Sequence, residues 1–125
     1  MQHSTRLTSS RRFSEIHQYG RGTANDLLVV RVLPNELDYS RIGFVVGRRV
    51  GGAVVRNRVK RRLREAVRTT PPIPGWDVVV IARRGADLAS FWQLQRSVTS
   101  LLRRLGLIEE NISAKGSPEL KAADR

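Results

Sequence analysis

Residues 48–68 constrain this chain more than any other part of its sequence. Nine of these 21 residues are lysine or arginine and only Glu65 is acidic, so the segment carries +8 of the total net charge of +12. Like charges at this density repel one another, and a fold must leave them at the surface, where a polyanion can neutralise them. The segment therefore predicts contact with the phosphate backbone of a nucleic acid.

The same segment predicts a helix over residues 55–68, because its apolar residues recur at helical spacing. The apolar positions share one face, which we expect to pack on a sheet, and they are Val55, Val59, Leu63, Ala66 and Val67. The side chains predicted on the opposite face are Asn57, Arg61, Arg64 and Arg68, and those predicted beside the apolar stripe are Arg58, Lys60 and Arg62. Basic groups thus cover three sides of a helix whose fourth side is anchored.

The rest of the chain predicts two more helices and three strands. The helices are expected at residues 8–19, with Thr8, Ser9 or Ser10 as the cap, and at 90–105, where Ser90 and Gln93 match a capping box. The strands are expected at 27–33, 41–46 and 76–83. We expect the first two strands to form a hairpin. The nearly continuous apolar run of the third strand predicts a central position in the sheet.

Several kinds of chemistry have no support in the sequence. The chain has no cysteine, so disulfides, thiolate metal ligands and a cysteine nucleophile are excluded. His3 and His17 are not placed as an acid–base pair, and the acidic residues form no cluster for a two-metal site. Capping or turn roles are expected for the acidic residues near loops and strand ends, which are Asp26, Glu36, Asp38, Asp77 and Asp87. We predict no catalytic and no metal-binding residue.

The location of the protein is also constrained by its apolar patterning. No apolar run is long enough to cross a bilayer, and the N-terminus lacks the apolar stretch of a secretory signal. We therefore expect a cytoplasmic protein.

Residues 47–68, with Arg56-Asn57-Arg58 at the centre, resemble the signature of the bacterial ribonuclease P protein subunit. The resemblance extends in consistent order over roughly residues 6–106. Its other parts are Arg6-Leu7, Phe13 and Gly20 in the first helix, Arg41-Ile42-Gly43 before the basic segment, and the strand at residues 77–83. A glycine-rich approach, a basic helix and flanking strands together are far more specific than the tripeptide alone.

This resemblance implies an α+β fold. It is a two-layer α/β sandwich with elements in the order α-β-β-β-α-β-α, a four-stranded sheet and a left-handed crossover at the basic helix. The fourth strand is absent from the pattern above, and a short segment near residues 22–25 or 50–54 could supply it. We expect one RNA-binding domain over residues 1–106 and a mobile polar tail over residues 107–125.

The resemblance also implies a function, that of an accessory subunit in endonucleolytic removal of the 5′ leader from precursor tRNA. The partner, ribonuclease P RNA, would carry the catalytic site and magnesium, and neither a membrane nor DNA is an expected partner. The implied RNA-binding residues are Arg48, Arg49, Arg56, Asn57, Arg58, Lys60, Arg61, Arg62, Arg64 and Arg68. Phe13 and His17 would line a cleft for the single-stranded leader, where bases can stack on aromatic rings.

Other interpretations of these features stay open at this point. Asn57 could cap the basic helix, Phe13 could be a core residue, and Gly51 and Gly52 could either approach phosphate or only permit a tight turn. Packing is the expected role of the other large aromatic residues, Trp76, Phe91 and Trp92. A structural RNA-binding protein, such as a ribosomal component, would share the charge and size. A membrane-surface helix is disfavoured because the apolar face is narrow and lacks aromatic anchors.

Overall fold

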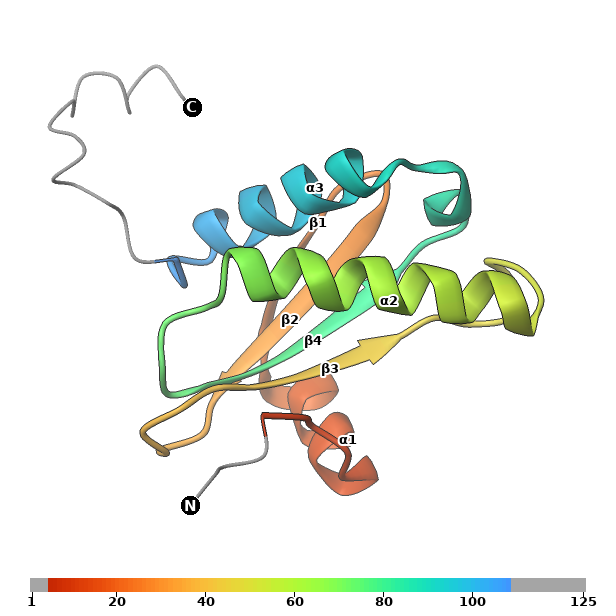
Figure 1. Ribbon diagram of the computed structural model, residues 1–125. Helices are drawn as coiled ribbons and strands as arrows, with labels where there is room; N and C mark the ends of the chain where they lie inside the picture. Colours follow the sequence, from red (N-terminus) through yellow and green to blue (C-terminus); the bar gives the residue numbers. More distant parts are fainter. Residues whose placement is uncertain (1–4, 109–125) are drawn as a thin grey trace, which may run out of the picture.

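The computed structural model describes residues 5–108, which form a four-stranded sheet flanked by helices (Figure 1). The elements are α1 (Ser10–Tyr19), β1 (Arg21–Ala24), β2 (Leu28–Pro34), β3 (Arg41–Val45), α2 (Ala53–Thr69), β4 (Trp76–Ala82), the 3-10 turn η1 (Ala86–Leu88) and α3 (Phe91–Arg104). Apart from the short turn η1, this is the element order that the family resemblance implied. The three predicted helices and the three predicted strands are all confirmed.

The sheet has the strand order β1-β2-β4-β3. Strand β2 runs antiparallel to both β1 and β4, whereas β3 runs parallel to β4. The predicted hairpin between β2 and β3 is therefore wrong, since β4 lies between them. Residues 77–80 of β4 are all buried, and only a central position covers both faces of such a strand. The central position of β4 is confirmed.

The fourth strand is β1, so the alternative near residues 22–25 is confirmed. The other candidate, residues 50–54, is not a strand, because residues 50–52 complete a turn and residues 53–54 begin α2. Strand β1 gave a weak signal because it is a short edge strand in which three of four residues are exposed. It therefore lacks the apolar alternation that marks a half-buried strand.

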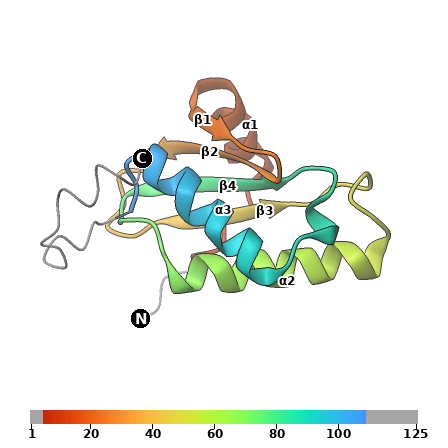
Figure 2. The same ribbon diagram turned by 90° about the horizontal axis from the view of Figure 1, so that it is seen from above.

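Two separate cores form on the two faces of the sheet (Figure 2). The larger one contains residues of α2 and α3, such as Leu63. It also contains alternate residues of β2 and β4, such as Val30 and Val80. The smaller one lies under α1 and consists of Leu7, Ile16 and Val79 with partly buried neighbours. The expected two-layer sandwich thus describes α2, α3 and the sheet, and α1 adds a third layer on the opposite face.

The apolar face predicted for the basic helix is confirmed. Val59, Leu63, Ala66 and Val67 are buried, and Val55 is half-buried at the start of the face. Burying these side chains against the sheet and α3 anchors the helix, because removal of apolar surface from water is the main driving force of packing. The helix begins at residue 53 with Gly52 as its cap. Asn57 lies in its interior, so a capping role for Asn57 is wrong.

The ends of α1 and α3 follow from local side chains and close contacts. Ser9 caps α1, and Ser90 and Gln93 form the predicted capping box of α3. A Cβ on Gly20 would lie 2.5 Å from the carbonyl oxygen of Ile16 and 2.6 Å from that of Val32. The φ of Gly20 is −80°, which any residue can adopt, so its backbone conformation does not require glycine. Glycine is required because the backbone at position 20 lies too close to these two carbonyl oxygens for a side chain to fit.

The packed domain extends slightly beyond its predicted boundary at residue 106. Gly106 has a φ of 77° and ends α3, as expected for a C-terminal glycine. Leu107 is buried, its N–H donates to the carbonyl of Leu102, and its carbonyl accepts from Ile73. The core therefore includes Leu107. Ile108 is partly buried against the same core, and residues 109–125 of the predicted tail lie outside the described residues.

A buried carboxylate ties α1 to the sheet. Asp77 on β4 is fully buried and accepts hydrogen bonds from Arg12 Nε at 2.6 Å, from Arg41 Nε and Nη2 at 2.8 and 2.7 Å, and from Asn35 Nδ2 at 2.9 Å. Burial acts to raise the pKa of Asp77, but the hydrogen bonds from Arg41, Asn35 and Arg12 outweigh it and hold the pKa below its ordinary value. A turn role for Asp77 is therefore wrong, and its role is to join α1, β3 and β4.

Candidate nucleic-acid interface

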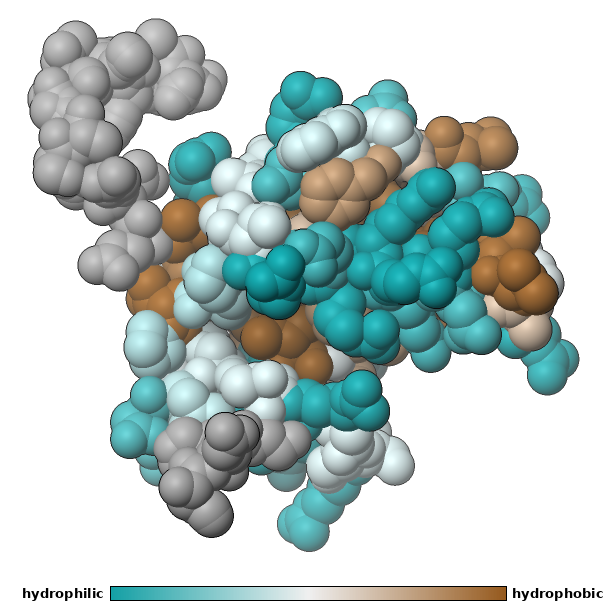
Figure 3. Space-filling view, in the orientation of Figure 1, coloured by the Kyte–Doolittle hydropathy of each residue, from teal (hydrophilic) through white to brown (hydrophobic). Residues whose placement is uncertain are grey.

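Helix α2 presents basic side chains wherever the sheet and α3 leave it open. Asn57, Arg61, Arg64 and Arg68 are exposed, as their predicted position opposite the apolar face requires. The flanking residues Arg56, Arg58, Lys60 and Arg62 are half-buried. Hydrophilic side chains accordingly gather over α2 on the face seen in Figure 3. The structure thus brings eight of the ten predicted RNA-binding residues together on one helix.

Two of these arginines are held in place by backbone carbonyl groups. Arg56 Nη1 donates to the carbonyl of Gly51 at 3.0 Å, and Arg62 Nη1 donates to the carbonyl of Ala89 at 3.0 Å. Each bond uses one of the five N–H groups of a guanidinium, and the rest of its planar fork can still bind phosphate oxygens. Fixing the side chains in advance reduces the entropy that would be lost on binding.

Carboxylates compensate little of this charge. Among the described residues, Arg68 is the one predicted RNA-binding residue that forms an ion pair, and its partner is Glu65 one turn earlier. Hydrogen bonding from Arg68 lowers the pKa of Glu65, so the carboxylate is ionised at neutral pH. The remaining cations of α2 keep their charge uncompensated, which favours an anionic partner.

Arg48 and Arg49 extend the basic surface beyond the helix. Both are exposed in a turn closed by hydrogen bonds from Val50 N to the Gly47 carbonyl and from Gly51 N to the Arg48 carbonyl. The turn leads directly into the N-terminus of α2, whose first turn contains no acidic residue. The positive end of the helix dipole therefore adds to the charge of the two arginines.

The second predicted site, on α1, lies on the opposite face of the sheet (Figure 2). Phe13 is half-buried and His17 is exposed, and both line a shallow hollow with Ser14 and Gln18. The ring of Phe13 lies against β3, where a Cβ on Gly43 would approach Phe13 Cζ to 2.5 Å. Phe13 therefore contributes to the small core and also to the hollow.

The other large aromatic residues differ in exposure. Trp76 is half-buried, with the guanidinium of Arg21 5.6 Å from its ring centroid. Phe91 is half-buried and meets Trp92 edge to face, with centroids 5.0 Å apart. Trp92 remains 66% exposed. A packing role is thus confirmed for Trp76 and Phe91, and Trp92 is mainly a surface residue.

The described residues contain no cluster of metal-ligating side chains. Over residues 5–108, no three side chains among histidine, aspartate and glutamate lie close enough together to hold one. Asp77 is the one fully buried carboxylate in this range, and both its oxygens already accept hydrogen bonds. Across the same range, no helix combines the length and apolar character that a membrane crossing requires.

The structure also contains a groove between α2 and β3 that the sequence did not predict. It has a volume of about 700 Å³ and brings Arg6 from the N-terminal segment beside Phe44 of β3 and Lys60 of α2. No local pattern could reveal it, because its walls come from segments far apart in the chain.

Comparison with known proteins finds one family to which this chain is similar. Residues 1–106 match a protein-family model described as ribonuclease P. The "Ribonuclease P protein component" of Dehalococcoides mccartyi is 42% identical over 110 residues, which cover 88% of this chain and 92% of the relative. That of Roseiflexus castenholzii is 44% identical over 117 residues, covering 90% and 95% of the two chains.

Solved structures agree with the sequence comparison. The RNase P protein of Staphylococcus aureus superimposes with a TM-score of 0.79 at 31% identity, covering 86% of this chain and all of the other. The RNase P protein of Thermotoga maritima gives a TM-score of 0.73 at 36% identity, with coverages of 79% and 96%. The matched residues of the family model include the basic segment, and the solved structures share the fold.

Proposed function

Since this chain belongs to the ribonuclease P protein family and is a protein subunit of the endonuclease that processes the 5′ end of precursor tRNA, we propose that it binds ribonuclease P RNA through the basic surface. This surface is formed by the ten residues Arg48, Arg49, Arg56, Asn57, Arg58, Lys60, Arg61, Arg62, Arg64 and Arg68. The catalytic groups then belong to the RNA, and the protein lowers the repulsion between two large polyanions.

The observation that carries this proposal is a helix anchored on one face and basic on the others. Its anchored face is apolar and buried, so binding RNA requires no refolding of α2.

Cleavage of precursor tRNA by ribonuclease P RNA at low magnesium tests the proposal. We expect the full-length chain to restore cleavage at the mature 5′ end. The variant Arg56→Ala/Arg58→Ala should need a higher protein concentration, by about tenfold or more for each arginine, because a charge-assisted hydrogen bond contributes about 1.5–3 kcal/mol.

A matched variant separates the site from net charge. Arg84→Ala/Arg96→Ala removes two exposed arginines outside the basic surface and should behave like the original protein. Circular dichroism would establish that all variants are folded. Equal losses in both double variants would contradict a specific role for the basic surface.

We further propose that magnesium is held by the partner RNA. Residues 5–108 bring no three metal-ligating side chains together, which supports a site on the RNA. The protein can still lower the magnesium requirement, since its cations neutralise phosphates that would otherwise need metal ions for screening.

The hollow on α1 is the site that we propose for the 5′ leader of precursor tRNA. Phe13 presents an aromatic ring at the surface of α1, and exposed His17 is one turn away on the same face. Unpaired bases stack on such rings with little sequence preference. The basic surface and the hollow lie on opposite faces of the sheet, so the subunit can bind both RNAs at once.

The leader proposal predicts a change in substrate discrimination. Phe13→Leu keeps an apolar side chain against β3 but removes the aromatic ring, and should weaken binding of leader-bearing precursor to the holoenzyme by about five- to tenfold. Binding of mature tRNA should stay the same, since it has no leader. Equal effects on precursor and mature tRNA, measured by equilibrium binding, would argue against the hollow as the leader site.

We also infer that the crossover from β3 through α2 to β4 is left-handed, as the family resemblance implies. The crossover joins neighbouring parallel strands, for which about 98% of known cases are right-handed. Handedness in an experimental structure of this chain would decide the point.

A further inference from the structure

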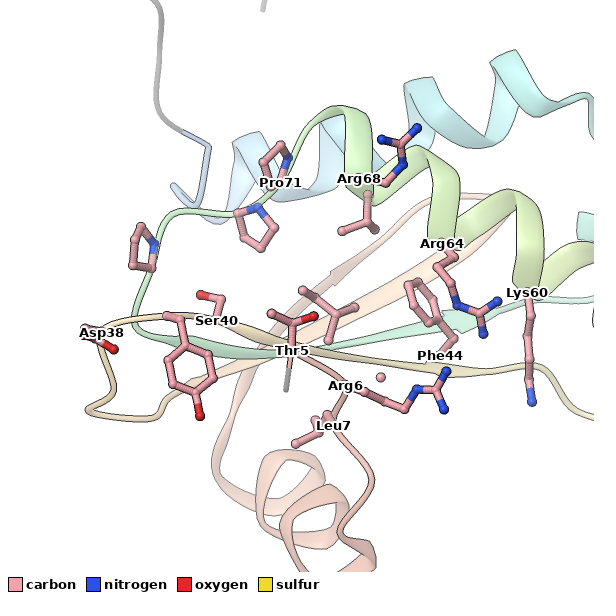
Figure 4. A pocket seen from close by; sticks show the side chains of 16 residues that line it. Thr5, Arg6, Leu7, Asp38, Ser40, Phe44, Lys60, Arg64, Arg68 and Pro71 are labelled. Carbon is pink, nitrogen blue, oxygen red and sulfur yellow. The ribbon is translucent and has the colours of Figure 1, made fainter. Parts of the chain in front are cut away.

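The groove between α2 and β3 shares Lys60, Arg64 and Arg68 with the basic surface, but most of its lining residues lie outside that surface. Three segments form its walls, namely residues 5–7, strand β3 and the C-terminal half of α2 (Figure 4). Residues 38–40 and the prolines at 71, 72 and 74 close one end. Its volume of about 700 Å³ falls within the roughly 300–1,000 Å³ of typical ligand sites.

The groove combines an apolar floor with cations at one end. Ile42, Phe44 and Val67 supply apolar surface. Figure 3 shows hydrophobic surface between the hydrophilic side chains of α2 and strand β3. Figure 4 shows Arg6, Lys60 and Arg64 reaching the same end beside Phe44, while Asp38 lies at the far end. The charged end therefore suits an anion, and the floor suits a flat apolar group.

The contacts at the charged end leave room for a ligand. Among the described residues, no carboxylate pairs with Lys60 or Arg64. The guanidinium carbon of Arg64 lies 5.8 Å from the ring centroid of Phe44, within cation–π distance. This contact holds the cation of Arg64 beside the apolar floor of the groove, where its charge can attract a phosphate.

Strand β3 adds backbone groups to the same groove. Ile42 N donates to the carbonyl of Thr5 at 2.8 Å, and the carbonyl of Ile42 accepts from Leu7 N at 3.0 Å, so residue 42 directs its peptide groups away from β4. In a strand, alternate residues face the same edge. The N–H and C=O of Phe44 therefore point to the edge of β3 that faces away from β4. Residues 5–7 pair with Ile42 on this edge.

We propose that this groove binds one unpaired RNA nucleotide, with the base on the apolar floor at Phe44 and the phosphate at Lys60 and Arg64. The inference rests on the proposed function for the class of ligand, because the family fixes RNA as the partner. The geometry supplies the rest, since a base has an aromatic face for the floor and a polar edge for the backbone of β3. Continuity with the basic surface brings RNA to the mouth of the groove.

Methyl-labelled full-length protein provides a test that reports position. The probes are a single-stranded uridine hexanucleotide and an abasic oligonucleotide of the same length and charge. We expect the uridine probe to shift the methyl resonances of Ile42 and Val67 in a saturable manner, and the abasic probe to leave them unchanged. Ile81 packs under α1 and reports binding at the other face.

Two variants approach the groove independently. Phe44→Leu keeps apolar packing but removes the ring, and should weaken the response of Ile42 and Val67 by about tenfold, as for other stacked bases. Thr5→Trp fills the groove from an exposed position and should abolish the response without disturbing the core. Trp92→Leu is the matched control, because it removes an exposed aromatic ring on α3 outside the lining of the groove, and it should leave the response unchanged.

Three results would overturn the proposal. They are shifts confined to Ile81, equal shifts with the abasic probe, and an unchanged response in folded Phe44→Leu and Thr5→Trp variants. A groove that takes a peptide instead would give no shift of Ile42 and Val67 with the uridine probe, and this result would also overturn the proposal. These results do not depend on cleavage, so failure of the groove and failure of the basic surface in the low-magnesium assay are distinguishable.

The holoenzyme shows which RNA supplies the nucleotide. If it comes from ribonuclease P RNA, Phe44→Leu weakens binding of that RNA and leaves the preference for leader-bearing precursor unchanged. If it comes from the leader, the preference falls and binding of ribonuclease P RNA is unchanged. Either result supports the groove as a nucleotide site, and no change in both quantities would contradict it.

Discussion

Replacing Asp77 with alanine is expected to lower the free energy of unfolding by about 3–5 kcal/mol. The change leaves the guanidinium groups of Arg12 and Arg41 and the amide of Asn35 without their shared acceptor, at a place where α1, β3 and β4 meet. Small domains are stable by only about 5–15 kcal/mol, so the loss is a large fraction of the total. Urea denaturation followed by circular dichroism measures it.

Asp26→Ala is the matched control, because Asp26 is exposed and has no ion pair among the described residues. It should change stability by no more than about 0.5 kcal/mol. If Asp77→Ala is as mild as this control, Asp77 does not join the three elements as described.

The pH dependence gives a second measurement on Asp77. Its lowered pKa means that the stabilisation is present above the ordinary value of 3.8 and is lost as the pH falls through the lower pKa of the folded state. The original protein should therefore lose stability below about pH 4, and Asp77→Asn should lose less over that range. Parallel curves for the two proteins would contradict the assigned hydrogen bonds.

Binding of ribonuclease P RNA is expected to weaken about 250-fold when monovalent salt rises fourfold, for example from 50 to 200 mM. If about six of the basic side chains neutralise phosphates of single-strand-like RNA, the logarithm of the affinity falls with the logarithm of salt at a slope near −4. The reason is that bound phosphates release their condensed counterions. Fluorescence anisotropy over a salt series measures the slope.

The two double variants make this prediction specific. Arg56→Ala/Arg58→Ala should make the slope shallower by about 1.4, since two phosphate contacts are lost. Arg84→Ala/Arg96→Ala has the same net charge but should keep the original slope. If both variants change the slope equally, the protein attracts RNA by its overall charge, and the assignment of contacts to α2 is wrong.

Local patterns in the sequence were sufficient for the elements of the fold. The i, i+4 spacing of Val59 and Leu63 predicted the buried face of α2, and the apolar run at residues 78–82 predicted the central strand. Both predictions succeed because side-chain periodicity follows directly from helix and strand geometry. The edge strand β1 was harder, since its exposed side chains carry no periodic signal.

Local sequence patterns could not predict the contacts between segments that are far apart in the chain. The insertion of β4 between β2 and β3 depends on which pairing buries the most apolar surface, and this is a property of the whole chain. Asp77 looked like a turn residue because its partners, Arg12 and Arg41, are 65 and 36 residues away. The local sequence around a buried charge does not show what neutralises it.

The sequence by itself determined that this protein has a basic helix with one buried face, and hence that it binds a polyanion. Charge density and helical spacing are local quantities, and no tertiary arrangement can remove them. Only the tertiary structure decided that α1 and α2 lie on opposite faces of the sheet, and that Arg6, Phe44 and Lys60 share a groove. These placements follow from packing three layers around one sheet, where residues far apart in the chain become neighbours because together they exclude water.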